Sequence, residues 1–549
     1  MPAGTRSTSV GDGLIYPNVY PIVCSDLAFA WPDGRIVLDG LDLVVGPGRT
    51  GLIGANGSGK STLLRLIAGE LTATRGSVKA PGRLGYLPQH LTLRSELSVE
   101  RVLGIADTRA ALAAIEAGDA SVENFTVLGE DWDVTERALA TLDRLGMADI
   151  ALDRLVGELS GGESILLGLA AQLLRRPDVL LLDEPTNNLD LRARQRLYDA
   201  VASWRGVLVI VSHDRELLEL VEQIAELRDG EVRWYGGNLS AYQRAVAVEQ
   251  EAAQRMVRAA ESDVKRQRRE LAEARIKLDR RQRYGQKMSE SKREPKIVMG
   301  ARKRQAQVSA GKHRIMHAEK LGQARDRLTD AEDAVRDDDE IRIDLPRTSV
   351  PARRTVVALS DVRLRYGPMV TLDVRGPERI ALVGANGAGK TTLLRTIAGA
   401  LQPVTGQVRL GVAARLLPQR LDVLDDALSV AQNVSRFAPD ADDNAIRARL
   451  ARFLLRGDRA DAIAGTLSGG ERFRATLAAL LLAEPAPQLL MLDEPTNNLD
   501  MASTRRLTDA LASYHGALIV ASHDVPFLRT TGATRWIELD GGLTEIDPL

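Results

Sequence analysis

The feature that most constrains the fold of this chain is a set of short motifs that occurs twice in the same order. A glycine-rich segment, GANGSGKS, ends at Ser61, and a closely related segment, GANGAGKT, ends at Thr391. Each is followed by a glutamine-bearing loop, an LSGGE segment, an apolar run that ends in Asp-Glu, and a Ser-His-Asp. A chain of 549 residues is long enough for two or three domains with separate cores. The expected parts are a leader (1–22), copy 1 of the motif set (23–240), a linker (241–344) and copy 2 (345–549).

The two copies differ in length at one place. Lys60 and Lys390 lie 330 positions apart, whereas His213 and His523 lie 310 apart. About twenty residues are therefore missing from copy 2, between its glutamine loop and its LSGGE segment. Peripheral helices and loops tolerate such changes and a central sheet does not, so we expect the difference in a surface-facing subdomain.

Short apolar runs with helical segments between them predict an α/β fold in both copies. Runs of this kind are typical of parallel strands buried on both faces. In copy 1 the expected strands are 50–53, 179–182 and 207–211. In copy 2 they are 380–383, 489–492 and 517–521.

The glycine-rich segments are suited to binding phosphate groups. A glycine-rich turn between a strand and a helix lets backbone N–H groups surround a phosphate, and the helix N-terminus adds a favourable dipole. In this motif the lysine, Lys60 or Lys390, reaches the β- and γ-phosphates, and Ser61 or Thr391 coordinates Mg²⁺. Finding the complete motif twice makes a ligand-free glycine turn a poor explanation.

The Asp-Glu pairs supply the other groups that phosphate hydrolysis needs. Asp183 ends an apolar strand and is expected beside the metal ion, as the second protein anchor for Mg²⁺. Glu184 is then placed to orient or deprotonate the attacking water. Asp493 and Glu494 repeat the arrangement.

The order of glycine-rich loop, glutamine loop, LSGGE, DEPTNNLD and SHD resembles the ATP-binding cassette family over nearly the whole chain. The resemblance implies that Gln89 and Gln419 contact the metal ion or the water, and that His213 and His523 sense the γ-phosphate. It implies that Asp190 and Asp500 link the two sites. The residues then expected at the metal ion are Ser61, Gln89, Asp183, Thr391, Gln419 and Asp493. The residues expected in catalysis are Glu184, Glu494, His213, His523, Gln89 and Gln419.

The same resemblance implies that the copies close head to tail over two ATP molecules. ATP on Lys60 would be completed by Ser468, and ATP on Lys390 by Ser160. Trp31 and Tyr366 would stack on adenine, and packing in a core is the alternative for both. The expected ATP-binding residues are Trp31, Gly54, Asn56, Gly57, Gly59, Lys60, Ser61, Thr62, Ser160, Gly161, Gly162, Tyr366, Gly384, Asn386, Gly387, Gly389, Lys390, Thr391, Thr392, Ser468, Gly469 and Gly470.

The two composite sites are expected to be unequal. After LSGGE, copy 2 continues with Arg472-Phe-Arg474, the polar continuation that the family favours. Copy 1 continues with the apolar segment 164–167, SILL. The hypothesis is that the site on Lys390, which Ser160 completes, closes or hydrolyses ATP differently from the site on Lys60.

The linker has the pattern of two helices that pair as an antiparallel coiled coil. On the outgoing stretch, apolar residues recur at intervals of seven, with alanines between them: Val257, Ala260, Val264, Leu271, Ala274 and Leu278. On the return they alternate at three and four: Leu321, Ala324, Leu328, Ala331 and Val335. Two helices of about 35 residues would extend roughly 50 Å.

The middle of the linker is strongly basic. From Arg275 to Lys320 there are fifteen Lys and Arg against four Asp and Glu. A charge run can simply be a solvated face, but positive charge at the end of a rigid hairpin favours contact with a phosphate backbone. Tyr284 is the sole aromatic residue in this stretch, so stacking on several single-stranded bases is not expected. Structured RNA, which is recognised by shape and backbone, therefore fits best. The candidate RNA contacts are Lys287, Lys292, Arg293, Lys296, Arg302, Lys303 and Arg304.

Two cassettes in one chain, joined by a basic helical linker, resemble the ABC-F subfamily. That resemblance implies binding to the ribosome near the peptidyl-tRNA, as a translation factor or an antibiotic-resistance factor. One departure is Asn188 and Asn498, where the subfamily commonly has His. Because the copies close on each other within one chain, a monomer is expected.

Composition limits the alternatives. A net charge of −1 means that attraction to nucleic acid must come from local clusters, and the lone Cys24 excludes an internal disulfide and a thiolate zinc site. No apolar stretch has the roughly 20 residues of a membrane span and no signal peptide is evident, so a cytoplasmic protein is expected.

A drug-export ATPase working with separate membrane subunits remains open, although the basic hairpin has no role there. A DNA-repair or chromosome-structure ATPase is the third possibility, but such proteins carry their coiled coil inside a cassette or have zinc-binding cysteines.

Overall fold

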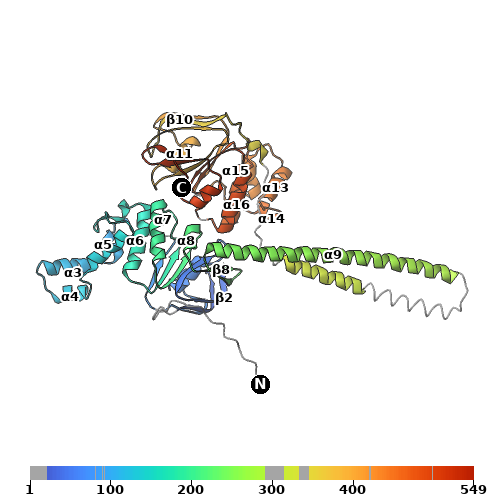
Figure 1. Ribbon diagram of the computed structural model, residues 1–549, viewed down its shortest axis with the longest axis horizontal. Helices are drawn as coiled ribbons and strands as arrows, with labels where there is room; N and C mark the ends of the chain where they lie inside the picture. The colour runs from blue at the N-terminus through green and yellow to red at the C-terminus, as the bar shows by residue number, and fades with distance from the viewer. Residues whose placement is uncertain are drawn as a thin grey trace, which may run out of the picture. The chain divides into compact units, whose positions relative to one another are not determined.

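The computed structural model describes residues 21–80, 82–89, 91, 93–290, 315–332, 345–419, 422–497 and 499–549. They form two compact units (Figure 1). The first contains both copies of the motif set, and the second contains the linker from Ser240. Each unit is described by itself below.

A six-stranded sheet forms the centre of copy 1, and its strands are buried on both faces. The strand order is β5-β6-β7-β3-β8-β9, and every neighbouring pair is parallel except β8 with β9. Continuous apolar runs such as VLVIV are typical of such strands because helices cover both faces of a parallel sheet. The three strands predicted from the sequence are confirmed. The bounds are β3 (Gly48–Ile53), β5 (Leu84–Leu87), β6 (Val179–Asp183), β7 (Val207–Val211), β8 (Gln223–Arg228) and β9 (Glu231–Gly236).

A small antiparallel sheet packs over the first helix of copy 1. It contains β1 (Ile22–Ala30), β2 (Ile36–Val45) and β4 (Arg75–Lys79) in the order β2-β1-β4. Helix α1 (Lys60–Ile67) buries Leu63 and Leu64 in one core with residues of this sheet and of β7. The glycine-rich loop before α1 is therefore held between two sheets.

The length difference between the copies lies in the peripheral helices, as predicted. Between the glutamine loop and LSGGE, copy 1 has α2 (Val99–Leu103), α3 (Ala106–Glu116), α4 (Val122–Leu128), α5 (Val134–Arg144) and the 3-10 turn η1 (Val156–Glu158). Copy 2 has α12 (Val430–Phe437), α13 (Asp443–Arg452), α14 (Asp458–Asp461) and η3 (Ala464–Thr466) there. Helices α3 and α4 contact each other and account for most of the difference. The remaining helices of copy 1 are α6 (Gly161–Leu174), α7 (Leu191–Ala202) and α8 (Arg215–Glu219).

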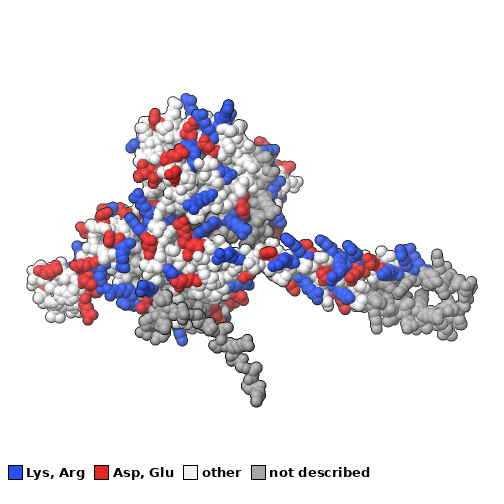
Figure 2. All heavy atoms as spheres, viewed as in Figure 1, with Lys and Arg blue, Asp and Glu red and all other residues white. Residues whose placement is uncertain are grey.

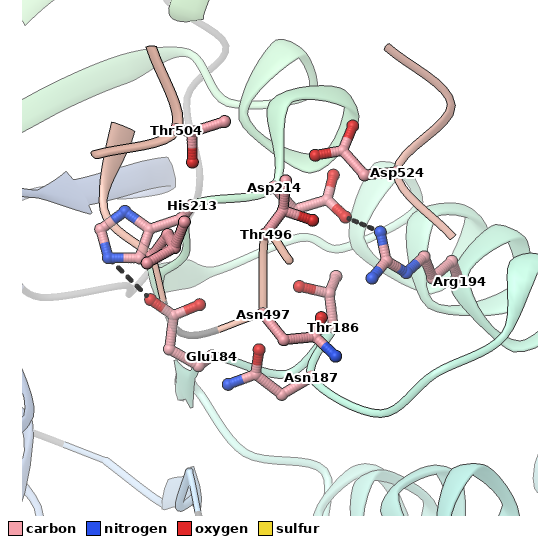
Figure 3. Close-up of a pocket in the computed structure, with 11 residues that line it drawn as sticks. Glu184, Thr186, Asn187, Arg194, His213, Asp214, Thr496, Asn497, Thr504 and Asp524 are labelled. Carbon is pink, nitrogen blue, oxygen red and sulfur yellow. Dashed lines mark hydrogen bonds and ion pairs between the residues drawn. The ribbon is translucent and has the colours of Figure 1, made fainter. Parts of the chain in front are cut away.

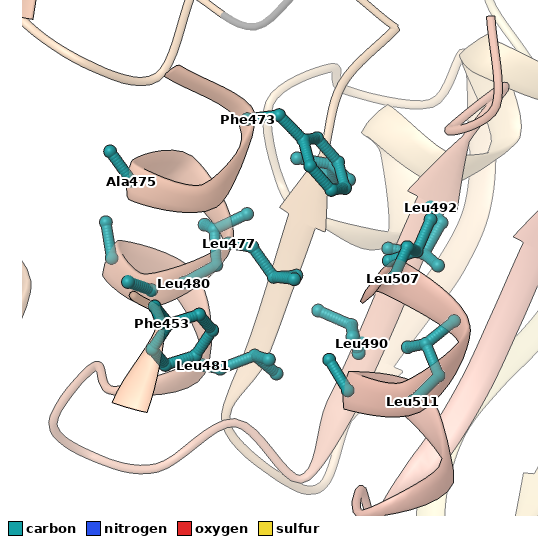
Figure 4. Packing of buried hydrophobic residues seen from close by; sticks show 14 of the residues in the cluster. Phe453, Phe473, Ala475, Leu477, Leu480, Leu481, Leu490, Leu492, Leu507 and Leu511 are labelled. Atoms are coloured by element: carbon teal, nitrogen blue, oxygen red, sulfur yellow. The ribbon is translucent and has the colours of Figure 1, made fainter. Parts of the chain in front are cut away.

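Copy 2 repeats the architecture. Its large sheet has the order β14-β15-β16-β12-β17-β18, with β17 and β18 antiparallel, and its small sheet has the order β11-β10-β13. A core with Phe453, Phe473 and Leu490 packs helix α15 (Gly469–Leu481) against the large sheet (Figure 4). This helix begins in the LSGGE segment and is called the signature helix of copy 2, as α6 is of copy 1. The elements are η2 (Pro346–Thr348), β10 (Thr355–Arg363), β11 (Met369–Arg375), β12 (Arg379–Val383), α11 (Lys390–Ile397), β13 (Thr405–Leu410), β14 (Ala414–Leu417), α15 (Gly469–Leu481), β15 (Leu489–Asp493), α16 (Met501–Ala512), β16 (Ala517–Ala521), α17 (Val525–Thr530), β17 (Arg535–Leu539) and β18 (Leu543–Ile546).

The linker unit contains two helices that lie side by side: α9 (Leu239–Glu290) and a helix over 315–332 (Figure 1). Heptad residues from both stretches meet in one apolar cluster, which contains Val264, Leu271, Leu321, Ala324 and Leu328. This confirms the predicted pairing of two helices over the described residues, while Val335 and the side chain of Leu278 lie outside them. None of the described helices is long and apolar enough to cross a membrane.

Candidate functional site

The glycine-rich loops have the backbone conformation that phosphate binding needs. Gly54 has a φ of 155°, and a Cβ there would lie 2.4 Å from the carbonyl oxygen of Leu227, so a side chain cannot be accommodated. Gly384 has a φ of 144° and the same limit, at 2.5 Å from the carbonyl oxygen of Leu539. The sheet packing thus requires glycine where each loop leaves its strand.

The lysines of the two loops turn back onto their own loops. Lys60 Nζ donates hydrogen bonds to the carbonyl oxygens of Gly54 and Ala55, at 2.8 and 2.9 Å. Lys390 Nζ donates to the Gly384 carbonyl oxygen at 2.7 Å. Burial lowers the pKa of both ammonium groups below its usual value. A buried ammonium that is held by uncharged partners is well placed to pair with the charge of a phosphate group.

The residues around the loops fit a nucleotide with a divalent cation. Ser58 Oγ is buried in the first loop and finds no hydrogen-bond partner among the described residues. Ser61 Oγ donates to Asp183 Oδ1 at 3.1 Å, and Thr391 Oγ1 donates to Asp493 Oδ1 at 3.2 Å. Hydroxyl and carboxylate oxygens side by side are the ligands that Mg²⁺ prefers. Both copies therefore have the oxygen pair expected from the sequence.

The two candidate catalytic glutamates share an unusual backbone conformation. Glu184 has a φ of 47° and Glu494 a φ of 45°, in the left-handed region that non-glycine residues rarely adopt. Their backbone N–H groups donate to Val211 and Ala521 of the neighbouring strands, at 2.8 Å in both copies. Strain of this kind clusters at functional sites. Sequence reasoning missed it, since it arises from strand pairing.

Burial also changes the acidity of these glutamates. It raises the pKa of Glu184 to about 8 and the pKa of Glu494 to about 7, even though the lysine of each loop acts in the opposite direction. A carboxyl group with a pKa near neutrality is suited to accept a proton from water. The site geometry is therefore compatible with the expected role of both residues.

Each histidine expected to sense the γ-phosphate lies against the glutamate of its own copy. His213 Nε2 is 3.3 Å from Glu184 Oε1, and His523 Nε2 is 3.4 Å from Glu494 Oε1 (Figure 3 shows the first pair). His523 Nε2 also lies 3.0 Å from Lys390 Nζ. Burial lowers the pKa of His213 to about 4, and that of His523 well below its usual range. Both imidazoles are consequently neutral at pH 7.

The glutamines are brought to the same edge of each sheet. Gln89 follows β5, whose last residue, Leu87, pairs with Leu182 of β6 in parallel register. Gln419 follows β14, which pairs with β15 in the same way. The carboxyl ends of these neighbouring strands place each glutamine near the Asp-Glu pair of its copy. Direct contact with a metal ion or water remains a prediction.

The LSGGE segments begin helices through capping boxes. In α6 the Ser160 side chain accepts from the Glu163 backbone N–H, and the Glu163 carboxylate accepts from the Ser160 backbone N–H. Ser468 and Glu471 do the same for α15. The Ser-x-x-Glu spacing could have been recognised as a cap in the sequence. The glutamate of the motif thus has a structural role.

The residues after LSGGE contact their own copy in different ways. Arg472 donates to Asp426 and to the Ala464 carbonyl oxygen, which ties α15 to the loop before α12. At the equivalent position in copy 1, Ser164 Oγ donates to the Ser160 carbonyl oxygen at 3.0 Å. The sequence difference therefore changes how firmly each signature helix is held. Unequal hydrolysis remains a prediction.

Contacts between the copies join each glycine-rich loop to the segment after the opposite Asp-Glu pair. The Asn56 backbone N–H donates to Asp500 Oδ2 at 3.0 Å, and Asn386 Nδ2 donates to the Asn188 carbonyl oxygen at 2.6 Å. Asn188 has a φ of 61°, a conformation that Asn tolerates better than most residues. These contacts agree with a head-to-tail arrangement, whereas closure of the LSGGE segments over nucleotide stays a prediction.

A polar pocket lies where the two copies meet (Figure 3). Its lining comes from the Asp-Glu and Ser-His-Asp regions of both copies: Glu184, Thr186, Asn187, Arg194, His213, Asp214, Thr496, Asn497, Leu499, Thr504 and Asp524. Arg194 was not anticipated from the sequence. It lies on α7, is 9% exposed, and donates to Asp214 Oδ2 at 3.1 Å.

The two aromatic residues expected on adenine occupy different places. Trp31 is the first residue of the β1–β2 loop and packs edge-on against Phe29, with ring centroids 5.1 Å apart. Tyr366 is the third residue of the β10–β11 loop and is 66% exposed. They are therefore not equivalent in the two hairpins, and their stacking on adenine remains a prediction.

The side chains of the candidate RNA contacts predicted from the sequence lie outside the part of the linker that the structure describes. The side chain of Lys287 lies outside the described residues, as do Lys292, Arg293, Lys296, Arg302, Lys303 and Arg304. Asn498 lies outside them too.

Comparison with known proteins matches both copies to one family. The sequence profile of the family described as "ABC transporter" matches residues 38–187 and 369–497. "Tylosin resistance ATP-binding protein TlrC" of Streptomyces fradiae is 35% identical over 525 residues, which cover 90% of this chain and 92% of TlrC. "Probable ATP-binding protein YheS" of Escherichia coli (strain K12) is 32% identical over 522 residues, covering 90% of this chain and 75% of YheS.

Solved structures share the fold at lower sequence identity. "RNase-L Inhibitor" has a TM-score of 0.57 at 19% identity, over 96% of this chain and 90% of its own. A crystal structure described as the complex of archaeal ribosomal stalk protein aP1 and archaeal ribosome recycling factor aABCE1 gives a TM-score of 0.55 at 19% identity, over 93% of this chain and 87% of that chain.

Proposed function

Since this chain belongs to the ATP-binding cassette family and has the tandem organisation of the ABC-F type, we propose that it is a ribosome-binding ATPase whose linker is the effector. It is an ATPase with two nucleotide sites. In the proposal, ATP binding closes the two copies on each other, and hydrolysis releases them from the ribosome. Its partner would be the ribosomal RNA near the peptidyl-tRNA. The protein would act in the cytoplasm as a monomer.

Each site would hold ATP with Mg²⁺ through residues described above. The glycine-rich loop and its lysine would hold the phosphates, and Ser61 with Asp183, or Thr391 with Asp493, would hold the ion. The ion would neutralise the charge of the phosphate groups. Glu184 and Glu494 would orient a water molecule and accept its proton, and the neutral His213 and His523 would donate to the γ-phosphate. The distances and the pKa shifts within each copy support this proposed division of roles.

The exposed basic surface of the linker carries the ribosome proposal. Figure 2 shows Lys and Arg side chains along the described part of the linker, with fewer Asp and Glu among them. The exposed basic residues of α9, among the side chains that the structure describes, are Arg244, Arg255, Arg258, Lys265, Arg266, Arg268, Arg269, Arg275, Lys277, Arg280 and Arg283. These residues lie on a helix that packs against the helix over 315–332 through the apolar cluster. A rigid basic rod suits the shape-based recognition of folded RNA and its phosphate backbone.

A role in antibiotic resistance is the narrower form of the proposal. The relative TlrC is named for tylosin resistance, and this chain covers 92% of it. Protection of the ribosome would need no membrane partner. In the competing role, as the ATPase of a drug exporter, the protein would associate with separate membrane subunits.

Sedimentation separates the two roles. The variant Glu184→Gln/Glu494→Gln should bind ATP without hydrolysing it, and should therefore stay on its target. We expect it to sediment with ribosomes in a sucrose gradient of lysate containing ATP, and to leave them when high salt screens the linker. Recovery in the membrane fraction instead would show the exporter role. A hydrolysis-active control, Arg192→Gln, changes an exposed residue of α7 and should not accumulate on ribosomes.

A further inference from the structure

We propose that Arg194 of copy 1 is a positioning residue for the ATP site of copy 2. In this proposal it holds, from across the interface, the Ser-His-Asp segment around His523. The Ser-His-Asp segments around His213 and His523 are called the first and the second switch loop. This goes beyond the motif residues because Arg194 belongs to none of them. It rests on ATP hydrolysis by the family and on the proposed roles of His523 and Glu494. It does not depend on ribosome binding, so the purified protein alone can test it.

The contacts of Arg194 reach both copies. Its Nε donates to the Leu189 carbonyl oxygen at 3.2 Å, and its Nη1 donates to Asp214 Oδ2 at 3.1 Å (Figure 3). The same Nη1 lies 3.5 Å from the carbonyl oxygen of His523, in copy 2. A buried guanidinium with three oxygen partners is held in one orientation. The backbone of the second switch loop is thus held by a side chain of the first copy.

Copy 2 has no equivalent of this arginine. The position that corresponds to Arg194 is Thr504, and the position that corresponds to Tyr198 is Thr508. The Thr508 hydroxyl donates to the Thr504 carbonyl oxygen, at 3.0 Å, within its own helix. The positioning contact therefore runs in one direction, from copy 1 to copy 2.

The two switch loops would respond differently to the loss of Arg194. Asp214, in the first loop, would keep the Tyr198 hydroxyl at 2.8 Å and the Leu217 backbone N–H at 3.0 Å. Asp524, in the second loop, faces Arg194 and Asp214 across the pocket (Figure 3). Burial raises the pKa of Asp524, the Asp214 carboxylate adds to this, and Arg194 opposes it. Without the arginine, two buried carboxylates would face each other, and the second loop would move away.

The effect on the reaction should appear in the rate and not in ATP affinity. Arg194 contacts neither glycine-rich loop, so the ground-state binding of ATP should be nearly unchanged. The placement of His523 and of the adjacent Glu494 should suffer instead. A residue that acts only through such placement changes kcat more than KM.

The experiment compares Arg194→Thr with the wild-type protein and with Arg192→Thr. Threonine is the residue that copy 2 has at the equivalent position. Arg192 is exposed on the same helix, so its variant controls for loss of a basic residue. Steady-state ATP hydrolysis by the full chain should show the copy 2 contribution to kcat lowered about fivefold or more, with KM for ATP within about twofold, because roughly one positioned hydrogen bond is lost. Arg192→Thr should match the wild type.

Photolabelling identifies the site that is affected. An azido derivative of ATP, trapped with vanadate, labels a site that has reached the transition state, and cleavage in the linker then separates the copies. We expect the label on copy 2 to fall and the label on copy 1 to persist. Arg194→Lys keeps a charge between Asp214 and Asp524 and should recover part of kcat. If Arg194→Thr fails to fold, Arg194→Gln keeps a donor without the charge and serves in its place. An equal fall of both labels, or an unchanged kcat, would overturn the proposal.

Discussion

Asp500 uses its two carboxylate oxygens for two different partners, one in each copy. Its Oδ1 accepts from the Ser503 backbone N–H at 2.8 Å and caps α16, while its Oδ2 accepts from the Asn56 backbone N–H at 3.0 Å. Burial raises the pKa of Asp500, but the hydrogen bonds from Ser503 and Asn56 outweigh this and lower it overall. The first glycine-rich loop is therefore held in shape by an ionised group of the other copy.

Replacing Asp500 should damage the Lys60 site beyond the loss of a helix cap. In Asp500→Ala, loss of the cap should lower the free energy of unfolding by about 1 kcal/mol. Release of Asn56 should in addition lower kcat/KM for ATP by about tenfold, because the loop is no longer preorganised. Calorimetry and ATP hydrolysis measure the two effects.

A matched control separates the cap from the contact between copies. Asp442 caps α13 through the Ala445 backbone N–H, in an exposed part of copy 2. Asp442→Ala should have a similar effect on stability and leave hydrolysis unchanged. If both variants lose activity equally, the Asn56 contact has no functional role.

Single glutamate variants test whether the two sites are equal. Arg472 anchors α15 to Asp426, whereas Ser164 in α6 bonds only within its own helix turn among the contacts described. We therefore expect Glu184→Gln and Glu494→Gln to lower turnover by different amounts, with the stronger single loss on the order of 10²-fold. Single-turnover measurements on both variants check this, and equal rates would contradict it.

The buried histidines should make the folded state sensitive to acid. The pKa of His213 is lowered by burial to about 4, so the unfolded chain binds a proton in a range where the folded chain does not. Stability should therefore fall as pH decreases from about 6.5 toward 4, by on the order of 3 kcal/mol for this residue. Denaturation in urea at a series of pH values measures the slope. His213→Gln should flatten it, and a variant with the wild-type slope would show that other groups dominate.

The apolar cluster of the linker should be required for ribosome binding but not for basal hydrolysis. Leu321→Asp places a charge in the contact with Val264 and should cost the helix pair roughly 2–4 kcal/mol. Gln323→Asp adds the same charge at an exposed position of the same helix. Only Leu321→Asp should lose sedimentation with ribosomes in the hydrolysis-deficient background. Retention by both variants would contradict the proposed role of the rigid linker.

The buried parallel strands could be predicted closely from the sequence. Strands 207–211 and 517–521 were predicted to the residue because a strand covered on both faces is apolar throughout. Strand β3 starts at Gly48, two residues before its apolar part, since hydrogen bonding continues beyond the pattern. The heptad spacing likewise predicted that the two linker helices pair, and in the structure Val264 and Leu321 meet in one cluster.

The parts of the site that depend on tertiary structure could not be predicted. The left-handed backbone of Glu184 follows from its hydrogen bond to a strand that comes 27 residues later. Arg194 reads as an ordinary helix arginine until the second copy brings the His523 carbonyl oxygen within reach. The motif residues were recognisable because local chemistry requires them, whereas these relationships require the packed sheets.

The backbone at Asn188 restricts which substitutions natural variation can bring to that position. Its φ of 61° places it in the left-handed region, and its carbonyl oxygen accepts from Asn386 of the other copy. Glycine, aspartate and histidine can adopt this conformation at little cost, and β-branched residues cannot. Asparagine at this position, where the resemblance to the ABC-F subfamily implies histidine, therefore lies within a small set of residues that the backbone permits, and this set should hold for as long as the two copies remain in contact.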